Sequence, residues 1–265
     1  MQISEMSKNK DILRLNLAKV DQSLVNVEEN WKKIDDELDF RKIGRKDTPF
    51  NAGVREKMMC AYGLLDDLLA KGIEPFSIES LEDMCELNNL VHYGLDFRLR
   101  QEYTKAIRAN EEKYYRNIDP IIHWYENHMK REPHPLKVAS EVYVAILGHP
   151  QLFIEGNHRA GSLIASWINM YYGYPPFVLS VKNAVPYFKP SADIKKFADK
   201  SSWRGRSRLP KYRKSFKEFW EKHLEWKYVL KNSESKNVKK KAEPDADSFF
   251  LWWRGQKKSG ATQNE

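Results

Sequence analysis

The sequence predicts an all-α protein, a helical bundle built around one helix–loop–helix unit. Apolar residues recur three and four positions apart in most of the long stretches, which is the spacing of one helix face. Glycine, proline and short polar residues stand where those stretches begin or end, as helix caps and breakers do. Residues 177–181 form the only run with strand composition, and one short run does not make a sheet.

Composition narrows the class of protein further. The chain has 265 residues, enough to bury a core, and its formal net charge of +8 favours an anionic partner such as nucleic acid, a nucleotide or an acidic membrane. The two cysteines, Cys60 and Cys85, argue against a disulfide framework and suit a reducing cytosol. No apolar run is long enough to cross a bilayer, and the N-terminus is not signal-like. We therefore expect a cytoplasmic protein, without excluding a secreted effector.

The first element is expected over residues 13–38, inside an N-terminal region spanning 8–45. Its apolar residues alternate by four and three, a heptad spacing that predicts one long helix with a narrow stripe. The stripe could form a homodimer seam or a docking surface for a partner, or it could pack along the protein's own domain. Residues 44–49 have the composition of a linker. The stripe consists of Leu13, Leu17, Val20, Leu24, Val27, Trp31, Ile34 and Leu38.

Two further helices are expected between this linker and residue 92. One begins at Asn51 or Val54 and ends at Leu69, with apolar residues on one face. The next begins after Ser80, which has the character of an N-cap, and runs through Val91.

The periodicity then loosens over residues 93–117, so no firm element is expected there. Asp119 as N-cap and Pro120 at the first helical position predict that a new helix begins at that point. Pro135 opens another helix, which ends at Gly148.

Residues 148–159, Gly-His-Pro-Gln-Leu-Phe-Ile-Glu-Gly-Asn-His-Arg, carry the sharpest functional pattern. Apolar residues at helical spacing follow as far as Tyr171, so Gly156, Asn157 and His158 occupy the N-terminal end of a helix. The first N–H groups of a helix lack partners and its dipole is positive there, which makes the spot an anion site. Arg159 adds a fixed charge whose fork geometry suits phosphate.

The C-terminal part changes composition. Residues 183–188 and 194–197 are expected to form a closing helical segment of the preceding domain. Residues 201–230 are expected to form a basic extension with a helix over 215–230. This extension could hold a nucleic-acid backbone and stack bases, or it could be a solvated face. Residues 231–265 are expected to be a disordered tail, in which the aromatic run at 249–253 could dock a partner, anchor at an interface or fold back. Arg204, Arg206, Arg208, Lys211, Arg213, Lys214 and Lys217 follow one another in this extension without an acid, with Trp203, Tyr212 and Phe216 among them.

The 148–159 stretch resembles the core motif of Fic-domain proteins, H-x-F-x-[DE]-G-N-G-R-x-x-R. Residues 134–136 before it and 172–176 after it are also similar to that family, so the resemblance covers about 119–188 and places a Fic-like helical domain at 46–200. By position, residues 95–108 resemble the Fic flap, a hairpin that lays target side chains near the active loop; they could equally be an exposed connection. The sequence departs from the motif in that Gln151 and Leu152 are inserted before Phe153, His158 replaces a glycine and Ser162 replaces an arginine.

The resemblance implies a transferase that moves AMP from ATP, with Mg²⁺, onto a Ser, Thr or Tyr hydroxyl of a protein. A neutral imidazole can take such a proton near pH 7, and Mg²⁺ prefers carboxylate and phosphate oxygens. The implied roles are His149 as general base, Glu155 as the Mg²⁺ ligand, the amides of Gly156, Asn157 and His158 on phosphate oxygens, Arg159 on the leaving diphosphate, and Phe153 as the anchor of the loop.

Three functions remain open from the sequence. The first is AMP transfer to a protein hydroxyl. The second is a Fic-fold phosphotransferase or degenerate nucleotide binder, since Doc toxins carry a non-glycine residue where His158 stands and use nucleotide as phosphotransferases. The third is a non-catalytic basic adaptor that works through the N-terminal helix and the basic extension.

Overall fold

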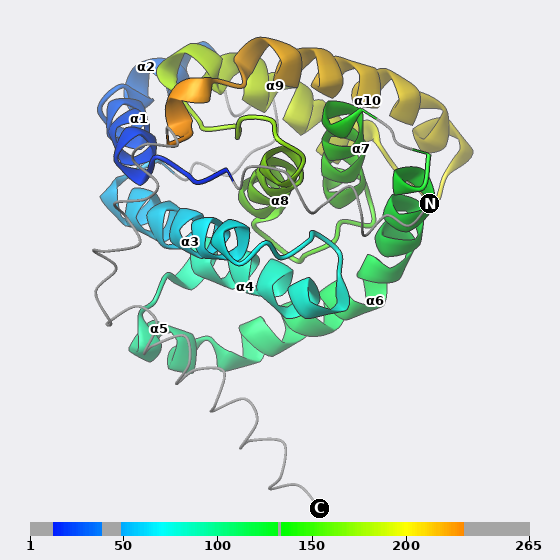
Figure 1. Ribbon diagram of the computed structural model, residues 1–265, viewed down its shortest axis with the longest axis horizontal. Helices are drawn as coiled ribbons and strands as arrows, with labels where there is room; N and C mark the ends of the chain where they lie inside the picture. The colour runs from blue at the N-terminus through cyan, green and yellow to red at the C-terminus, as the bar shows by residue number, and fades with distance from the viewer. Residues whose placement is uncertain (1–12, 39–48, 132–133, 231–265) are drawn as a thin grey trace, which may run out of the picture. The chain divides into compact units, whose positions relative to one another are not determined.

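The computed structural model describes residues 13–38, 49–131 and 134–230, and Figure 1 shows their arrangement. Within these ranges the chain forms ten α-helices and no β-strand, which confirms the all-α prediction. Among the described helices, none combines the length and the apolar character that a membrane crossing requires. The expected linker at 44–48 and the tail at 231–265, with its aromatic run at 249–253, lie outside the described residues.

The N-terminal region holds two helices, α1 (Leu17–Glu29) and α2 (Trp31–Leu38), so the prediction of one long helix is wrong. The break falls at Asn30, whose side-chain amide donates to Asn26 O at 2.8 Å and so competes with the backbone for that carbonyl. The stripe is buried from Val20 to Leu38, because α1 packs on α3 (Ala52–Ala70) and α2 packs on α9 (Val181–Phe197). Of the interpretations open from the sequence, packing along the protein's own helices is the one observed.

The helices α3 and α4 (Leu81–Tyr93) confirm the two predicted between residues 51 and 91. The next segment differs from the prediction. Residues 97–129 form α5 (Phe97–Glu102) and α6 (Thr104–Met129), so a hairpin flap at 95–108 and a helix start at Asp119 are both wrong. Pro120 lies inside α6 on its exposed side, where solvent can satisfy the carbonyl that loses its donor.

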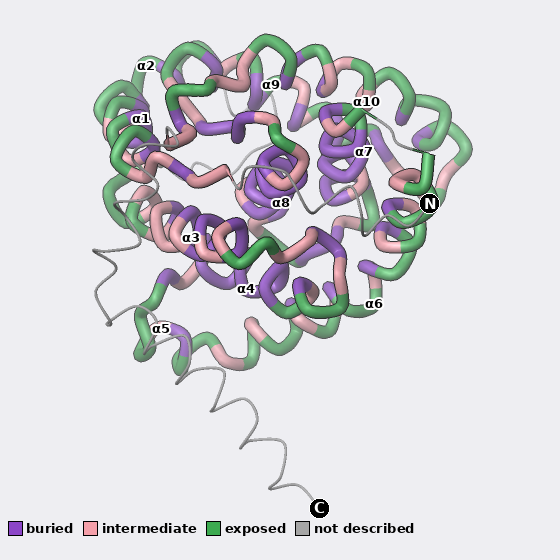
Figure 2. The backbone as a smooth tube through the Cα atoms, viewed as in Figure 1, coloured by how far each residue is buried: buried purple, intermediate pink, exposed green. Residues whose placement is uncertain are grey.

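The core is centred on α8 (Asn157–Tyr171), which contacts α3, α4 and α7 (Pro135–Leu147). Almost every residue of α8 is buried, as Figure 2 shows. A methyl group at Gly161 would lie 3.3 Å from side chains of Tyr143 and Leu147, so this glycine permits the close approach of α8 to α7. The predicted ends of α8 are confirmed, with Gly156 and Gly173 both at positive φ just outside it.

The last helices are α9, which covers the expected closing segment in one helix, and α10 (Trp203–His223). The helix predicted over 215–230 begins earlier in the structure, at Trp203, and ends sooner, at His223. Helix α10 packs on α7 and α9 and buries Phe216 and Trp220. The described residues up to Val229 thus belong to one compact unit, which includes most of the segment that composition set apart as an extension.

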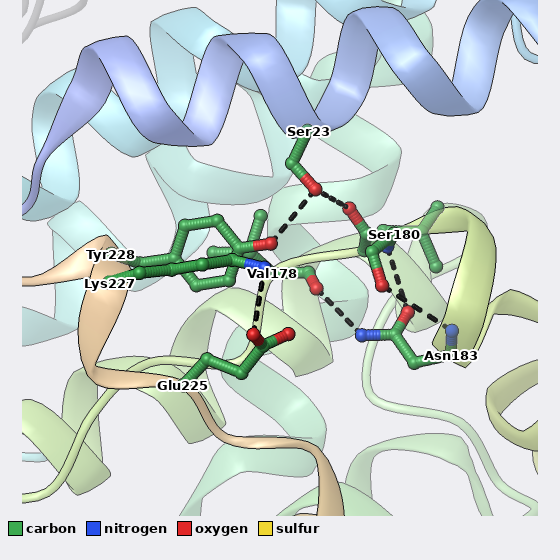
Figure 3. A network of polar contacts seen from close by, with 8 residues as sticks. Ser23, Val178, Ser180, Asn183, Glu225, Lys227 and Tyr228 are labelled. Atoms are coloured by element: carbon green, nitrogen blue, oxygen red, sulfur yellow. Dashed lines mark hydrogen bonds and ion pairs between the residues drawn. The ribbon is translucent and has the colours of Figure 1, made fainter.

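An extended segment at 174–180 connects α8 to α9. Ser23 of α1 donates to Leu179 O at 2.8 Å and lies 2.9 Å from the hydroxyl of Tyr228, and Figure 3 shows this network. Ser180 and Asn183 cap the start of α9 reciprocally. These contacts hold the C-terminal end of the segment, and Tyr174 N donates to Asn169 O at 2.8 Å at its other end. Phe177 is buried between the two ends.

Candidate functional site

The site begins at the N-terminus of α8. Gly156 has φ 75° and ψ 4°, the left-handed conformation, and no side chain caps the helix. A methyl group at this position would lie 2.3 Å from His92 Nε2 and 2.7 Å from Asn88 Nδ2. Both the backbone conformation and the close approach of α4 therefore require glycine, and the first amides of α8 lack a capping side chain.

Side chains of α6 hold the loop that leads into α8. Asn110 accepts from Ile154 N at 2.9 Å, Lys113 donates to Phe153 O at 2.9 Å, and Asn117 donates to Gln151 O at 3.3 Å. These three residues follow the spacing i, i+3, i+7, so they share one face of the helix.

Further contacts from α4, α8 and α6 complete the support of this loop. Asn88 of α4 donates to Glu155 O at 3.0 Å and accepts from Asn110 at 2.8 Å, which links α4, α6 and the loop. The side chain of Asn157 closes on the backbone of Phe153, accepting at 2.9 Å and donating at 3.0 Å. Phe153 is fully buried and stacks on Tyr114 with ring centroids 5.3 Å apart.

A cavity of about 380 Å³ lies against the N-terminus of α8, within the range typical of small-molecule sites. Its mostly polar lining residues are 155–159 together with Gln151, Ser162 and Lys195. Arg159 and Lys195 are cationic, and Glu155 is the single carboxylate among the described lining residues. The remaining wall is mostly apolar or aromatic, with Leu24, Met58, Tyr62, Phe177, Leu179, Tyr187 and Phe188.

Arg159 is held in place by α4, because its guanidinium donates to Val91 O near the C-terminal end of that helix. Burial, with Arg159 as the next largest cause, lowers the pKa of the neighbouring His92 to about 4, so this imidazole is neutral at physiological pH. The hydroxyl of Tyr187 donates to His158 O at 2.9 Å, which fixes the first turn of α8 from the α9 side. Ser162, at the position of the motif's last arginine, donates to Arg159 O at 2.8 Å.

The structure does not bring His149 to this cavity. Its side chain is exposed and is not among the residues that line the cavity. Its backbone pairs with the connection between α9 and α10, donating to Ala198 O and accepting from Lys200 N, both at 2.7 Å. Gln151 lines the cavity instead, and its side-chain amide donates to Leu147 O at 3.2 Å. A carboxamide has no basic nitrogen that could take a proton near pH 7.

The residues fit a Mg²⁺ ion that arrives with a nucleotide. In the described part of the chain no three His, Cys, Asp or Glu side chains gather as a metal cluster. Mg²⁺ is commonly held by one or two carboxylates together with substrate phosphates and water. Glu155, exposed at the cavity, could supply such a carboxylate.

Sequence reasoning found the residues at the start of α8 and missed those that support them. Asn88 and His92 of α4, and Asn110, Lys113 and Asn117 of α6, carried no functional prediction. The spacing of the three α6 residues was a usable signal, because polar side chains at i, i+3 and i+7 lie on one face of a helix.

Comparison with known proteins adds no assignment, since no family model, curated protein or solved structure matches the chain. The resemblance to Fic proteins therefore rests on the motif and its flanking residues in the sequence alone. The case for function depends on the geometry around α8.

Proposed function

We propose that this protein binds a nucleotide in the cavity at the N-terminus of α8. The carrying observation is that the uncapped N-terminus of α8 and two cationic side chains, Arg159 and Lys195, line the same cavity. The first amides of a helix and its positive end favour phosphate oxygens, and the cations add to that attraction. The amides of Gly156, Asn157 and His158 are the donors we assign to phosphate.

The rest of the cavity suits the remainder of a nucleotide. Tyr62, Phe177 and Phe188 offer aromatic surface against which a base could pack. Glu155 is positioned to share a Mg²⁺ ion with the phosphates, which is the only chemistry that we assign to the metal.

The geometry favours binding over AMP transfer. Transfer to a protein hydroxyl requires a base near the phosphorus centre. His149 is exposed outside the cavity, and Gln151, which lines it, cannot take the proton. Of the three functions open from the sequence, a degenerate nucleotide binder therefore agrees best with these contacts.

Calorimetric titration with ATP and ADP, with and without Mg²⁺, tests the proposal. Two adjacent lysines give a matched pair, because Lys195 lines the cavity and Lys196 does not, although both are exposed at the end of α9. Removing an exposed cation from a phosphate site costs about 1 kcal/mol, so Lys195→Ala should weaken binding about fivefold and Lys196→Ala should leave it within about twofold. Equal effects of the two changes, or no binding by the unaltered protein, would contradict the proposal.

A second assay separates binding from transfer. The protein is incubated with α-labelled ATP, Mg²⁺ and a cell lysate, beside His149→Ala and Glu155→Ala. We expect no labelled protein from any of the three. Label that disappears in both variants would establish AMP transfer and return His149 to the role that the motif implies.

A further inference from the structure

The positive charge of this chain is concentrated where α9 ends and α10 runs. Residues 195–217 contain ten lysines and arginines against one aspartate, whereas the whole chain carries a formal +8. In the described residues Arg204, Arg206 and Lys211 are exposed and form no ion pair with a carboxylate. A surface with this excess of unpaired cations attracts a polyanion.

Three of these cations share one face of α10, and two of the three line a groove. Arg204, Arg208 and Lys211 follow the spacing i, i+4, i+7, which puts them on one face of α10. Arg208 and Lys211 line a groove of about 450 Å³ between α9 and α10, together with Phe197 and Tyr212. Asp193 of α9 is the one acid among the described residues that line it.

Aromatic side chains are exposed at the two helix ends that adjoin this surface. Trp203, the first residue of α10, is 75% exposed, and Phe197, the last residue of α9, is 38% exposed. The guanidinium of Arg208 lies 5.2 Å from the centroid of the Phe197 ring. Cations that hold a phosphate backbone, alternating with exposed rings on which bases stack, are the surface that single-stranded nucleic acid requires.

The alternative of an acidic membrane surface agrees less well with the packing of α10. A helix that lies in a membrane interface needs its apolar face free to enter the lipid. The apolar residues of α10, among them Phe216, Phe219 and Trp220, are buried, and the helix packs on α7 and α9. The side left to solvent is cationic.

We infer that the α9–α10 face binds single-stranded nucleic acid. Arg204, Arg208 and Lys211 contact successive phosphates, while Trp203 and Phe197 stack on bases. This function is independent of the nucleotide cavity at α8, whose lining residues include none of these five.

Fluorescence anisotropy with labelled oligouridine and oligothymidine, over a salt series, tests the cationic contacts. Reversing three phosphate contacts should weaken binding about tenfold or more and reduce the slope of log affinity against log salt by about 2. The control makes the same change in net charge on the exposed surface of α1 and α2 and should match the unaltered protein. The test variant is Arg204→Glu/Arg208→Glu/Lys211→Glu, and the control is Lys19→Glu/Lys32→Glu/Lys33→Glu.

A single change separates stacking from charge. Trp203→Ala should weaken binding about five- to a hundredfold while leaving the salt slope unchanged, because the ring carries no charge. ATP binding at the α8 cavity should be the same in Trp203→Ala and in the unaltered protein.

Four outcomes would overturn the inference. The control triple could lose as much affinity as the test triple, or Trp203→Ala could have no effect. Duplex could bind as tightly as single strands, which would remove the role of stacking. Vesicles of phosphatidylserine could bind where neither oligonucleotide does, which would assign the face to lipid.

Discussion

The two ends of the 148–159 motif are held by different parts of the molecule. His149, at one end, pairs through its backbone with Ala198 and Lys200, and its side chain faces solvent. Gly156, at the other end, lies against α4, and the residues after it line the cavity. Two residues that are close together in a sequence motif therefore need not line the same cavity. The backbone at His149 is held by the connection between α9 and α10, whereas Gly156 is held against α4. Substitutions at either end of the motif test this difference.

The largest effect is expected at the cavity end, for Gly156→Ala. Alanine costs about 1–2 kcal/mol at a left-handed φ and the clash with His92 and Asn88 adds a similar amount, so the free energy of unfolding should fall by about 3 kcal/mol. Asn88 cannot move aside without losing its bonds to Glu155 O and Asn110. Urea denaturation measures the change.

Gly173→Ala is the matched control for this substitution. Gly173 also has a positive φ, of 84°, but a methyl group there would meet nothing within 4 Å. We expect a loss of only about 1–2 kcal/mol, from the backbone alone. Equal losses at the two glycines would mean that α4 does not confine the start of α8.

The difference between the two ends also explains which features the sequence could predict. The start of α8 is local information, because a glycine, polar residues and an apolar period follow one another within a few residues. The part of α6 before Asp119 was missed because its buried residues include Asn110 and Tyr114, so hydrophobic periodicity alone does not reveal it. The direction of the His149 side chain depends on residues about fifty positions later in the chain, and no local pattern contains that pairing.

A smaller effect is expected from Asn110→Ala, which removes the support of the cavity end by α6. Asn110 is buried and uses both side-chain atoms, so its loss leaves Ile154 N and Asn88 Oδ1 without these partners. Unsatisfied groups of this kind cost about 2 kcal/mol in the free energy of unfolding, and nucleotide affinity should fall as well.

The neighbouring contact at Asn117 serves as the control for Asn110. Asn117 is partly exposed and its bond to Gln151 O is longer, at 3.3 Å, so Asn117→Ala should cost less than about 1 kcal/mol. Chemical denaturation measures the stability of both variants, and ATP titration measures their nucleotide affinity. An Asn117 effect as large as that of Asn110 would indicate that α6 supports the whole loop evenly.

At the His149 end, the stability should depend on pH through Lys200. Burial, with the charge of Lys113 as a second cause, lowers the pKa of Lys200 to about 8 from 10.5. Between these values the unfolded chain keeps a proton that the folded chain has released, so the free energy of unfolding rises with pH across this window. We expect the free energy of unfolding to rise by about 1.5 kcal/mol across this window. This is roughly half of what the full difference between the two pKa values would give, because the side chain of Lys200 is partly exposed.

Lys200→Met should abolish this part of the rise, whereas Lys196→Met, at an exposed lysine four positions earlier, should retain it. Urea denaturation of the three proteins from pH 8 to pH 10.5 isolates the contribution of Lys200 as a difference. A rise that persists in Lys200→Met would assign it to other groups.

The smallest effect is expected from His149→Ala. Alanine keeps both backbone hydrogen bonds of residue 149, and the exposed imidazole makes no contact with the cavity, so the free energy of unfolding should change by no more than about 0.5 kcal/mol. ATP affinity should also be unchanged, because the phosphate donors belong to α8. A tenfold loss of affinity would require the loop to carry the ring into the cavity when nucleotide is present. The two ends of the motif would then act together in the bound state, and the difference between them would hold only for the protein without its ligand.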